Sequence, residues 1–522
     1  MKLWITSMEC AGIAEAGGVK NVTFSLCKEF SNINHNVTLF IPIYKCNSFD
    51  LITDYDTDFI KNVEINHCGK SEFVSYNKAK CVEGNFNVIF IDHPAFSQKE
   101  AVYTYTASEQ KMNPEFIKGT GHVDTLFMDS LFAKAVTKFG QLIDPSDLPD
   151  IIHCQDASTA LIPAFVKNSD IYKNTQAVVT IHNAGPAYHH NFSNLGEAVW
   201  YTNFDENKLT GALNNGKIEP FLLAYNSGAY LTTVSENYAE ELTDPANNEA
   251  TEGLAEIFHN RNIQITGITN GIDVDRYDPS DINISKLPFA FNPEKADLDG
   301  KYKCRNFFLN EIIKNKKLPE EVSIYGNFEE TDNGKDEIYI VYHGRITAQK
   351  GIKVLIDAIP VILDNFDFVR FIITGQGELS IENALQEITN KYKGRVVFLN
   401  GYAKQIARLS NAVGDFIVLP SYFEPCGLED FISQAYGTLP VAHATGGLKK
   451  IVNEKTGFLY ENNTPQALAV KLSEVIAIKK YNNDFINNMI KYTFGYIKEN
   501  YLWKNVIKNK YLPFFEKISK KS

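Results

Sequence analysis

The sequence predicts an α/β protein in which mostly parallel sheets are covered by helices on both faces. Short apolar runs alternate with longer amphipathic stretches along the chain, and each run is rich in β-branched or aromatic residues. The runs are apolar at successive positions, which is typical of strands buried on both faces of a sheet. A polar segment divides these runs into two groups, so we expect two doubly wound α/β domains.

The expected strands follow one another in a regular order. The first group comprises 3–7, 37–41, 88–91, 151–153, 177–181 and 231–234, and the second comprises 338–342, 369–374, 396–399, 416–419 and 440–442. Amphipathic patterns between the strands predict helices, for example over 19–30, 125–139 and 351–363. The polar, Tyr-rich stretch 103–121 is expected to be an irregular surface loop.

The segment 278–336 separates the two strand groups. It is polar and rich in Lys and Asn, contains Pro288 and Pro293, and carries the acidic run 329–332. We interpret it as an insertion within the second domain and place the hinge near 235–238, where the first strand group ends. The expected domains are therefore 1–236 and 237–499.

Composition restricts the possible functions. The 522 residues are 44% apolar and 22% charged, as in ordinary globular proteins, and the net charge of −12 makes nucleic acid an unexpected partner. No apolar run reaches the ~18–20 residues that span a bilayer, and no secretory signal is recognisable. The eight cysteines form no CxxC pair, so we expect neither a zinc site nor a disulfide framework, but a reduced cytoplasmic protein.

The loop 344–351 follows an expected strand and carries two cations, Arg345 and Lys350. Ligands of open parallel sheets bind at the carboxyl ends of strands. Arg presents a planar fork of donors and Lys a point charge, so the two side chains could converge on a diphosphate without a metal. The alternative is two solvated surface cations, which is the usual environment of these residues.

Two further loops follow strands in the second half. In 420–430, the carboxylate of Glu424 beside Pro and Gly could accept hydrogen bonds from sugar hydroxyls, or it could cap the next helix. Tyr422 could stack on a nucleobase, whereas Cys426 is expected to pack as a small buried side chain. In 444–448, the Gly446-Gly447 backbone could bind phosphate oxygens, or it could form a plain turn.

The first half has weaker candidates. Gly17-Gly18 opens an expected helix, where free N–H groups and a close backbone approach could serve an anion or merely form a tight turn. His182-Asn183 and Asp156 each follow a strand. A lone His at such a position is more often structural than functional.

Together these motifs resemble the retaining GT-B glycosyltransferases, specifically the bacterial glycogen synthase and plant starch synthase family, over nearly the whole chain. The family's Lys-x-Gly-Gly-Leu, His-Asp-Trp, Ile-His-Asn and Thr-Val-Ser segments correspond to 15–19, 155–157, 181–183 and 233–235. Its Asn-Gly-Ile-Asp turn and Arg…Gln-Lys-Gly element correspond to 270–273 and 345–351, and its Phe-Glu-Pro-Cys-Gly-Leu and Tyr-Gly-Thr-Leu-Pro…Thr-Gly-Gly-Leu boxes to 423–428 and 436–448. The last two boxes, at this spacing, are highly specific.

The resemblance implies two Rossmann-like domains facing across a deep cleft, with the C-terminal helix 500–522 returning to the first domain. It implies transfer of glucose, with retention, from ADP-glucose or UDP-glucose to the non-reducing end of an α-1,4-glucan, with no metal required. It implies a catalytic set of Arg345, Lys350, Glu424 and His182. The implied donor-binding set is Glu15, Gly17, Gly18, Asn270, Tyr422, Gly427, Leu428, Thr445, Gly446 and Gly447, and the implied acceptor-binding set is Glu9, Asp156 and Asn183.

The sequence departs from the family pattern at loops that face substrate. Glu15 replaces the family's Lys, which puts an anion where a cation is expected near the donor, and Lys20-Asn21 replaces Ala-Asp. Ala157 replaces a Trp that would offer a sugar-stacking face. Glu429-Asp430 replaces Thr-Gln, and Lys449-Lys450 replaces Ala-Asp.

These departures leave two alternatives to a glycogen or starch synthase. One is another retaining GT-B transferase with a different acceptor, which the loss of the Trp at Ala157 favours. The other is a catalytically degraded homologue that binds glucan, which Glu15 favours. A glycogen phosphorylase is less favoured, because its chains are longer and its cofactor-bearing Lys has no counterpart that we can identify in this sequence.

Overall fold

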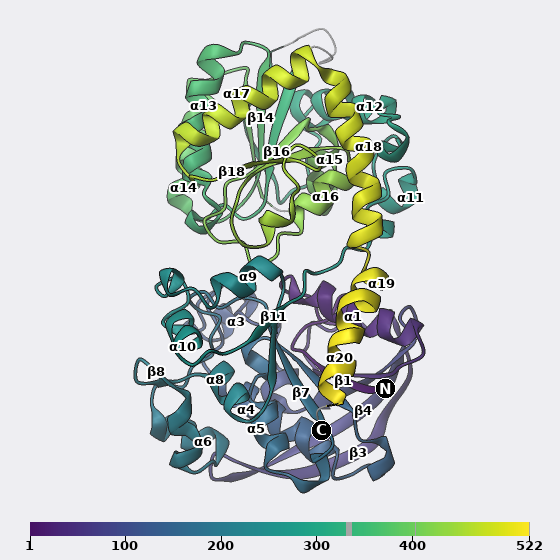
Figure 1. Ribbon diagram of the computed structural model, residues 1–522, viewed down its shortest axis with the longest axis vertical. Coiled ribbons are helices and arrows are strands. Elements are labelled where there is room, and N and C mark those ends of the chain that lie inside the picture. Colours follow the sequence, from purple (N-terminus) through teal and green to yellow (C-terminus); the bar gives the residue numbers. More distant parts are fainter. Residues whose placement is uncertain (330–336, 402, 521–522) are drawn as a thin grey trace. The chain divides into compact units, whose positions relative to one another are not determined.

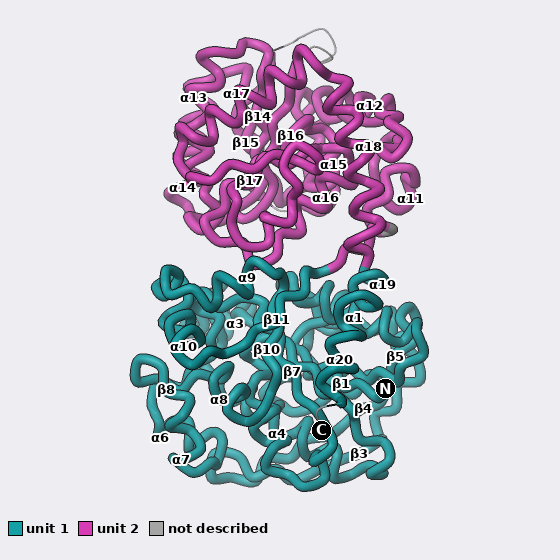
Figure 2. Tube along the Cα trace, viewed as in Figure 1, with its two compact units in different colours: residues 1–270, 503–522 teal, residues 271–502 magenta. Residues whose placement is uncertain are grey.

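The computed structural model describes residues 1–329, 337–401 and 403–520, and the chain divides into two compact units. Unit 1 comprises Met1–Asn270 and Trp503–Ser522, and unit 2 comprises Gly271–Leu502 (Figure 2). The boundary therefore falls at 270–271 and not near 235–238. The reason is that β11 (Ile265–Gly267) pairs in parallel with β10 (Tyr230–Thr233), which extends the first sheet beyond the expected hinge.

Unit 1 contains a nine-stranded sheet in the order β11-β10-β7-β6-β1-β2-β5-β4-β3 (Figure 1). Its other parallel strands are β1 (Lys2–Thr6), β2 (Asn36–Pro42), β5 (Phe86–Asp92), β6 (Ile151–Gln155) and β7 (Gln176–Ile181). A long antiparallel hairpin, β3 (Ile52–His67) and β4 (Lys70–Cys81), forms one edge, and a small separate hairpin consists of β8 (Leu213–Asn214) and β9 (Lys217–Ile218).

Helices lie between the strands of unit 1 and in its C-terminal segment. They are α1 (Val19–Asn32), α2 (Pro94–Ser97), α3 (Ala107–Met112), α4 (Thr125–Phe139), α5 (Ile162–Lys167), α6 (Leu195–Thr202), α7 (Glu206–Leu209), α8 (Pro220–Asn226), α9 (Glu236–Glu241), α10 (Leu254–Asn260), α19 (Trp503–Val506) and α20 (Leu512–Ser519). The C-terminal segment packs onto this unit, where the ring of Phe515 stacks on Phe30 with the centroids 5.4 Å apart. Tyr511 and Phe515 also contact His153 of β6.

Unit 2 contains a seven-stranded sheet in the order β12-β15-β14-β13-β16-β17-β18. The strands are β12 (Ser323–Gly326), β13 (Ile338–His343), β14 (Val369–Gly375), β15 (Val396–Asn400), β16 (Phe416–Leu419), β17 (Leu439–His443) and β18 (Phe458–Tyr460), and all but β12 are parallel. The helices are α11 (Ile282–Ser285), α12 (Asp299–Phe307), α13 (Ile352–Asn365), α14 (Leu379–Lys391), α15 (Lys404–Val413), α16 (Glu429–Ala435), α17 (Pro465–Tyr481) and α18 (Asn483–Asn500).

The segment 278–336 is not the polar insertion that its composition predicts. Its helix α12 buries Arg305 against Asp415, with Nη2 and Oδ2 2.9 Å apart, and its strand β12 forms the antiparallel edge beside β15. Lys301 and Arg305 of α12 are buried and donate to acceptors in the segments that lead into β16 and β17, so a weakly apolar sequence is nevertheless part of the core. Most of the acidic run 329–332 lies outside the described residues.

The stretch 103–121 is also more ordered than expected. It contains α3, which begins with a capping box between Thr106 and Glu109. Tyr105 is buried and stacks on Phe116 with ring centroids 4.2 Å apart. Across the described part of the chain, no helix combines the length and apolar character needed to cross a bilayer.

Candidate functional site

Three loops of unit 2 leave the same edge of the sheet. They follow β13, β16 and β17, which are adjacent parallel strands, and comprise 344–351, 420–428 and 444–450. The backbone N–H of Tyr422 donates to the carbonyl of Gln349 at 3.0 Å, and that of Gly447 donates to the carbonyl of Glu424 at 2.8 Å. The strand order thus assembles all three predicted loops into one connected surface at the position where open α/β sheets bind ligands.

Lys350 and Glu424 form an ion pair between the first two of these loops. Lys350 Nζ donates to Glu424 Oε2 at 2.5 Å, and the Ser421 hydroxyl donates to the same oxygen at 3.0 Å. Burial by itself would raise the pKa of Glu424, but the ammonium of Lys350 and the hydroxyl of Ser421 hold it below its usual value. Glu424 is therefore an ionised carboxylate in a fixed position.

Arg345 lies on the same loop as Lys350 but is exposed. Its carbonyl accepts a hydrogen bond from the Tyr342 hydroxyl at 2.7 Å, which holds the backbone of the loop. Its guanidinium has no hydrogen bond or ion pair with any residue that the structure describes. The loop turns at Gly351, where φ is +66° and a Cβ would lie 1.7 Å from the carbonyl oxygen of Pro420, so only glycine fits.

The turn that follows β17 is packed against the loop that follows β16. A Cβ on Gly447 would lie 2.0 Å from the carbonyl oxygen of Cys426, and the Thr445 hydroxyl donates to the Tyr422 carbonyl at 3.3 Å. Because the Gly447 N–H is already bonded to Glu424, it is not free to bind a phosphate as the sequence predicts. Gly446 precedes it with φ +44°.

The other predicted residues of this loop have distinct environments. Tyr422 is 55% exposed, and Cys426 is buried, as a packing role requires. Leu428 packs against a buried cluster that includes Phe431 and Ile272. Gly427 adopts φ +72°, and the backbone N–H groups of Gly427 and Leu428 have no hydrogen-bond partner within the described residues.

In unit 1, the glycine loop before α1 is held by a buried carboxylate. Glu9 Oε2 accepts hydrogen bonds from the N–H groups of Ala16 at 3.1 Å and Gly17 at 2.5 Å. Burial raises the pKa of Glu9, whereas these two amides and Lys20 act in the opposite direction. The amide of Gly17 is therefore engaged, while that of Gly18 has no hydrogen-bond partner in the described chain.

The anion at Glu15 is partly neutralised locally. Its Oε2 lies 3.1 Å from Lys20 Nζ, and its Oε1 accepts the N–H of Gly12 at 3.0 Å. The substitution of the family's Lys is thus accompanied by a cation in the first turn of α1, and the pair carries no net charge.

Asp156, His182 and Asn183 meet at the carboxyl ends of β6 and β7. Asp156 Oδ1 accepts the N–H of His182 at 3.3 Å, and Asp156 has φ +66°, a strained conformation for a residue with a side chain. Burial raises the pKa of Asp156 to about 7 and lowers that of His182 to about 3, so the imidazole is neutral. His182 Nε2 lies 2.8 Å from Gln155 Oε1, and Asn183 Oδ1 accepts the N–H of Gly185 at 2.7 Å.

The sequence reasoning missed a second histidine here. His190 Nδ1 lies 2.5 Å from Oδ2 of Asp129 on α4. Burial by itself would lower the pKa of His190, but Asp129 and, more weakly, Asp156 raise it above its usual value. The dipeptide His189-His190 after a strand was an available signal, although the partner Asp129 lies 61 residues away and no local pattern links the two.

Asn270 is the last residue of the first segment of unit 1. Its backbone N–H donates to the Val234 carbonyl at 3.3 Å, and its buried Oδ1 has no hydrogen-bond partner in the described residues.

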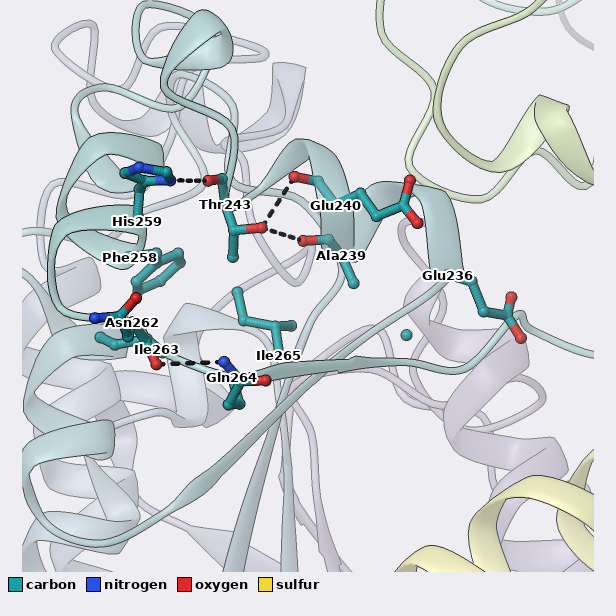
Figure 3. Close-up of a pocket in the computed structure, with 11 residues that line it drawn as sticks. Glu236, Ala239, Glu240, Thr243, Phe258, His259, Asn262, Ile263, Gln264 and Ile265 are labelled. Atoms are coloured by element: carbon teal, nitrogen blue, oxygen red, sulfur yellow. Dashed lines mark hydrogen bonds between the residues drawn. The ribbon is translucent and has the colours of Figure 1, made fainter.

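A separate pocket of about 390 Å³ lies in unit 1 between α9, α10 and β11 (Figure 3). It contains none of the predicted site residues. The Thr243 hydroxyl donates to the carbonyls of Ala239 and Glu240, and His259 Nδ1 donates to the carbonyl of Thr243, so several of its polar groups bond to one another (Figure 3). The functional candidates therefore lie at the strand ends and not in this pocket.

Comparisons with known proteins divide the chain into the same two halves. The family model described as starch synthase catalytic domain matches residues 2–260, and that described as glycosyl transferases group 1 matches residues 311–492. A glycogen synthase from Thermodesulfovibrio yellowstonii is 29% identical over 99% of this chain and 97% of its own length. One from Mycoplasma mobile is 28% identical over 98% of this chain and 99% of its own length.

Solved structures have the same fold. The catalytic domain of starch synthase IV from Arabidopsis thaliana, bound to ADP and acarbose, aligns with a TM-score of 0.79 at 21% identity and covers 99% of both chains. The sucrose-phosphate synthase from Thermosynechococcus elongatus aligns with a TM-score of 0.53 at 15% identity over the whole of both chains.

Proposed function

The chain belongs to the family of bacterial glycogen synthases and plant starch synthases, and from this premise we propose that it elongates an α-1,4-glucan with glucose from ADP-glucose. It is a hexosyltransferase with the GT-B fold. Its relatives named glycogen synthase match nearly its full length, which supports a glucan as acceptor. The starch synthase IV structure, described as bound to ADP and acarbose, supports a nucleotide donor and a glucan-like acceptor.

The observation that carries the proposal is the Lys350–Glu424 ion pair with the exposed guanidinium of Arg345 on the same loop. When the bond between glucose and the diphosphate breaks, negative charge develops on the departing phosphate. Lys350, which is fixed by Glu424, and the exposed Arg345 would stabilise that charge as cations, the role that a metal has in many other transferases. We therefore propose that no metal is required.

Glu424 would act on the sugar side of the breaking bond. Its pKa is held low, so it stays ionised at neutral pH and can accept hydrogen bonds from sugar hydroxyls or stabilise a developing oxocarbenium ion. Lys350 would have two roles: it holds Glu424 in place, and it stabilises the departing diphosphate. The amides of Gly18, Gly427 and Leu428, which lack partners among the described residues, are the backbone donors available to the nucleotide sugar.

The acceptor side would use the strand-end cluster of unit 1. His182 is neutral, so it can hydrogen-bond a glucose hydroxyl without adding charge. Asp156 and Asn183 adjoin it, while Glu9 acts indirectly by holding the backbone of Gly17. We propose a cytoplasmic location, with which the absence of a disulfide bond among the residues that the structure describes agrees.

The test is incubation of the full chain with radiolabelled ADP-glucose or UDP-glucose and glycogen. We expect incorporation of label into glycogen, with ADP-glucose preferred, and retention of the α configuration by NMR. A folded protein that incorporates glucose from neither donor would contradict the proposal. If UDP-glucose is preferred, the donor assignment is wrong while the transfer reaction stands.

A further inference from the structure

Lys450 and Asp430 form a buried ion pair behind the loop 426–428. Lys450 Nζ lies 3.0 Å from Asp430 Oδ2, and the two side chains are 4% and 0% exposed. Both positions are among those at which the sequence departs from the pattern of its family, which has Asp and Gln there. Because the structure brings the two residues into contact, the two departures form one feature.

The ammonium of Lys450 is bonded to the backbone of the loop 420–428 and of its own loop, 444–450. It donates to the carbonyls of Cys426 at 2.6 Å, Gly427 at 2.7 Å and Gly447 at 3.1 Å. Its three hydrogens match three carbonyl acceptors, so Asp430 supplies the compensating charge. Hydrogen bonds from a charged donor are shorter and stronger than those between neutral groups, and Lys450 therefore holds these carbonyls firmly.

Fixing the two carbonyls also fixes the amides on the other side of the same peptide units. In a trans peptide the C=O and N–H point in opposite directions, so the N–H groups of Gly427 and Leu428 point away from Lys450. These are the two N–H groups of the loop without a partner in the described residues. Gly427 allows this arrangement, because a Cβ there would lie 2.9 Å from Leu448 and 3.2 Å from Lys450 Nζ.

We propose that Lys450, held by Asp430, is a positioning residue that aims the amides of Gly427 and Leu428 at oxygen atoms of the nucleotide sugar. The inference rests on the proposed function and adds a determinant of donor binding that is particular to this chain. The same contacts affect Glu424, because Gly447, which Lys450 also binds, donates its N–H to the Glu424 carbonyl. Loss of the ammonium would therefore loosen the loop 420–428. It would leave Asp156, His182 and Asn183 of unit 1 unaffected.

The decisive experiment compares Lys450→Met with Lys449→Met in the full chain. Lys449 is the exposed neighbour and serves as the matched control. We expect Lys450→Met to raise the donor KM at least tenfold while the KM for glycogen changes less than twofold, and we expect the control to resemble the wild type. A purely structural role would lower the melting temperature and leave the donor KM unchanged, which would overturn the proposal.

Calorimetry with ADP then shows whether the amides of Gly427 and Leu428 face phosphate oxygens or sugar oxygens. A tenfold loss of ADP affinity in Lys450→Met supports amides that face the phosphates, whereas unchanged ADP affinity with a raised donor KM supports amides that face the sugar.

Two further variants keep the test valid if Lys450→Met fails to fold. Asp430→Asn retains the ammonium, and we expect a smaller, severalfold rise of the donor KM. The exchange variant Asp430→Lys/Lys450→Asp retains both charges but places a carboxylate against the carbonyls, so we expect it not to restore donor binding. Wild-type donor KM in either variant would overturn the proposal.

Wild-type activity and the donor KM of the variant together distinguish a failure of the proposed function from a failure of this inference. If the wild-type chain transfers glucose from neither donor, the function and this inference both fall. If the wild type is active and Lys450→Met has a normal donor KM, the inference alone falls.

Discussion

Lys350 Nζ lies 2.5 Å from Glu424 Oε2, although the two residues are 74 positions apart in the sequence. The contact exists because β13 and β16, after which their loops begin, are neighbours in the sheet. The side chains are 21% and 15% exposed, so the pair is shielded but remains accessible to a ligand. A cation and an anion are thus held together at the strand ends, where the proposed donor site lies.

Glu424→Gln should lower kcat by about 10²- to 10³-fold, because the variant keeps the shape but removes the charge that would face the developing cation. The measurement is glucose transfer to glycogen at saturating donor. Glu474→Gln is the matched control, since Glu474 pairs with Lys471 at 2.6 Å on the surface of α17. A kcat within threefold of the wild type for Glu424→Gln would exclude a catalytic role for this carboxylate.

Glu15→Lys should lower the donor KM severalfold, because it replaces the Glu15–Lys20 pair with two cations beside the glycine loop. The gain should shrink as salt is raised, since this site is partly exposed. Stability should change by less than about 1 kcal/mol, because such ion pairs contribute little. Glu15→Gln should lie between the wild type and Glu15→Lys, and an unchanged donor KM in both variants would show that this loop does not face the donor.

His153→Gln should make the protein less sensitive to acid. Burial lowers the pKa of His153 to about 3, against about 6.5 in the unfolded chain, so between these values only the unfolded chain binds the proton. Stability is therefore present above pH 6.5 and is lost as the pH falls towards 3. The variant should flatten the slope of unfolding free energy against pH by about 1.4 kcal/mol per unit.

Urea unfolding at several pH values between 4 and 6.5 measures this slope. Because His182 contributes in the same direction and Asp156, whose pKa is raised to about 7, in the opposite direction, the difference between variant and wild type is the informative quantity. An unchanged slope would mean that His153 binds a proton in the folded protein.

Arg305→Met should destabilise unit 2 by about 3–5 kcal/mol, because it leaves a buried carboxylate without its closest cation. Arg305 and Asp415 are each 2% exposed, and Lys479 Nζ, 3.1 Å from Asp415, compensates only in part. The check is the free energy of unfolding in urea.

The control for Arg305 is Lys498→Met, which breaks a surface pair with Glu294 and should cost less than about 1 kcal/mol. A loss of similar size for the buried and surface pairs would show that 299–307 is peripheral, as its composition suggests.

Each strand expected from the sequence is present, because an apolar run buried on both faces is a local signal. The hairpin of β3 and β4 escaped prediction for the opposite reason. Most residues of Ile52–His67 are exposed and polar, and this strand is stabilised by pairing along its length with Lys70–Cys81. A strand that is stabilised by such pairing has no apolar run by which the sequence could predict it.

Sequence patterns also singled out individual residues of the candidate site. Arg345, Lys350 and Glu424 were recognisable because polar residues after a buried strand stand at a binding edge, whichever strands surround them. Their partners were not recognisable. The bond from Gly17 to Glu9 and the pairs His190–Asp129 and Lys450–Asp430 join segments whose proximity depends on how the sheets and loops pack.

Whether a backbone N–H is available to a ligand also depends on how the loops pack. The glycine amides after β17 looked available, yet the approach of Gly447 to Cys426 commits one of them to Glu424. The residue types and the strand ends are properties of neighbouring positions along the chain, and these could be known in advance. Only the tertiary structure decides which charged groups pair and which amides are left without a protein partner. The reason is that ion pairs and hydrogen bonds depend on distance in space, and distant segments of the chain come close only on folding.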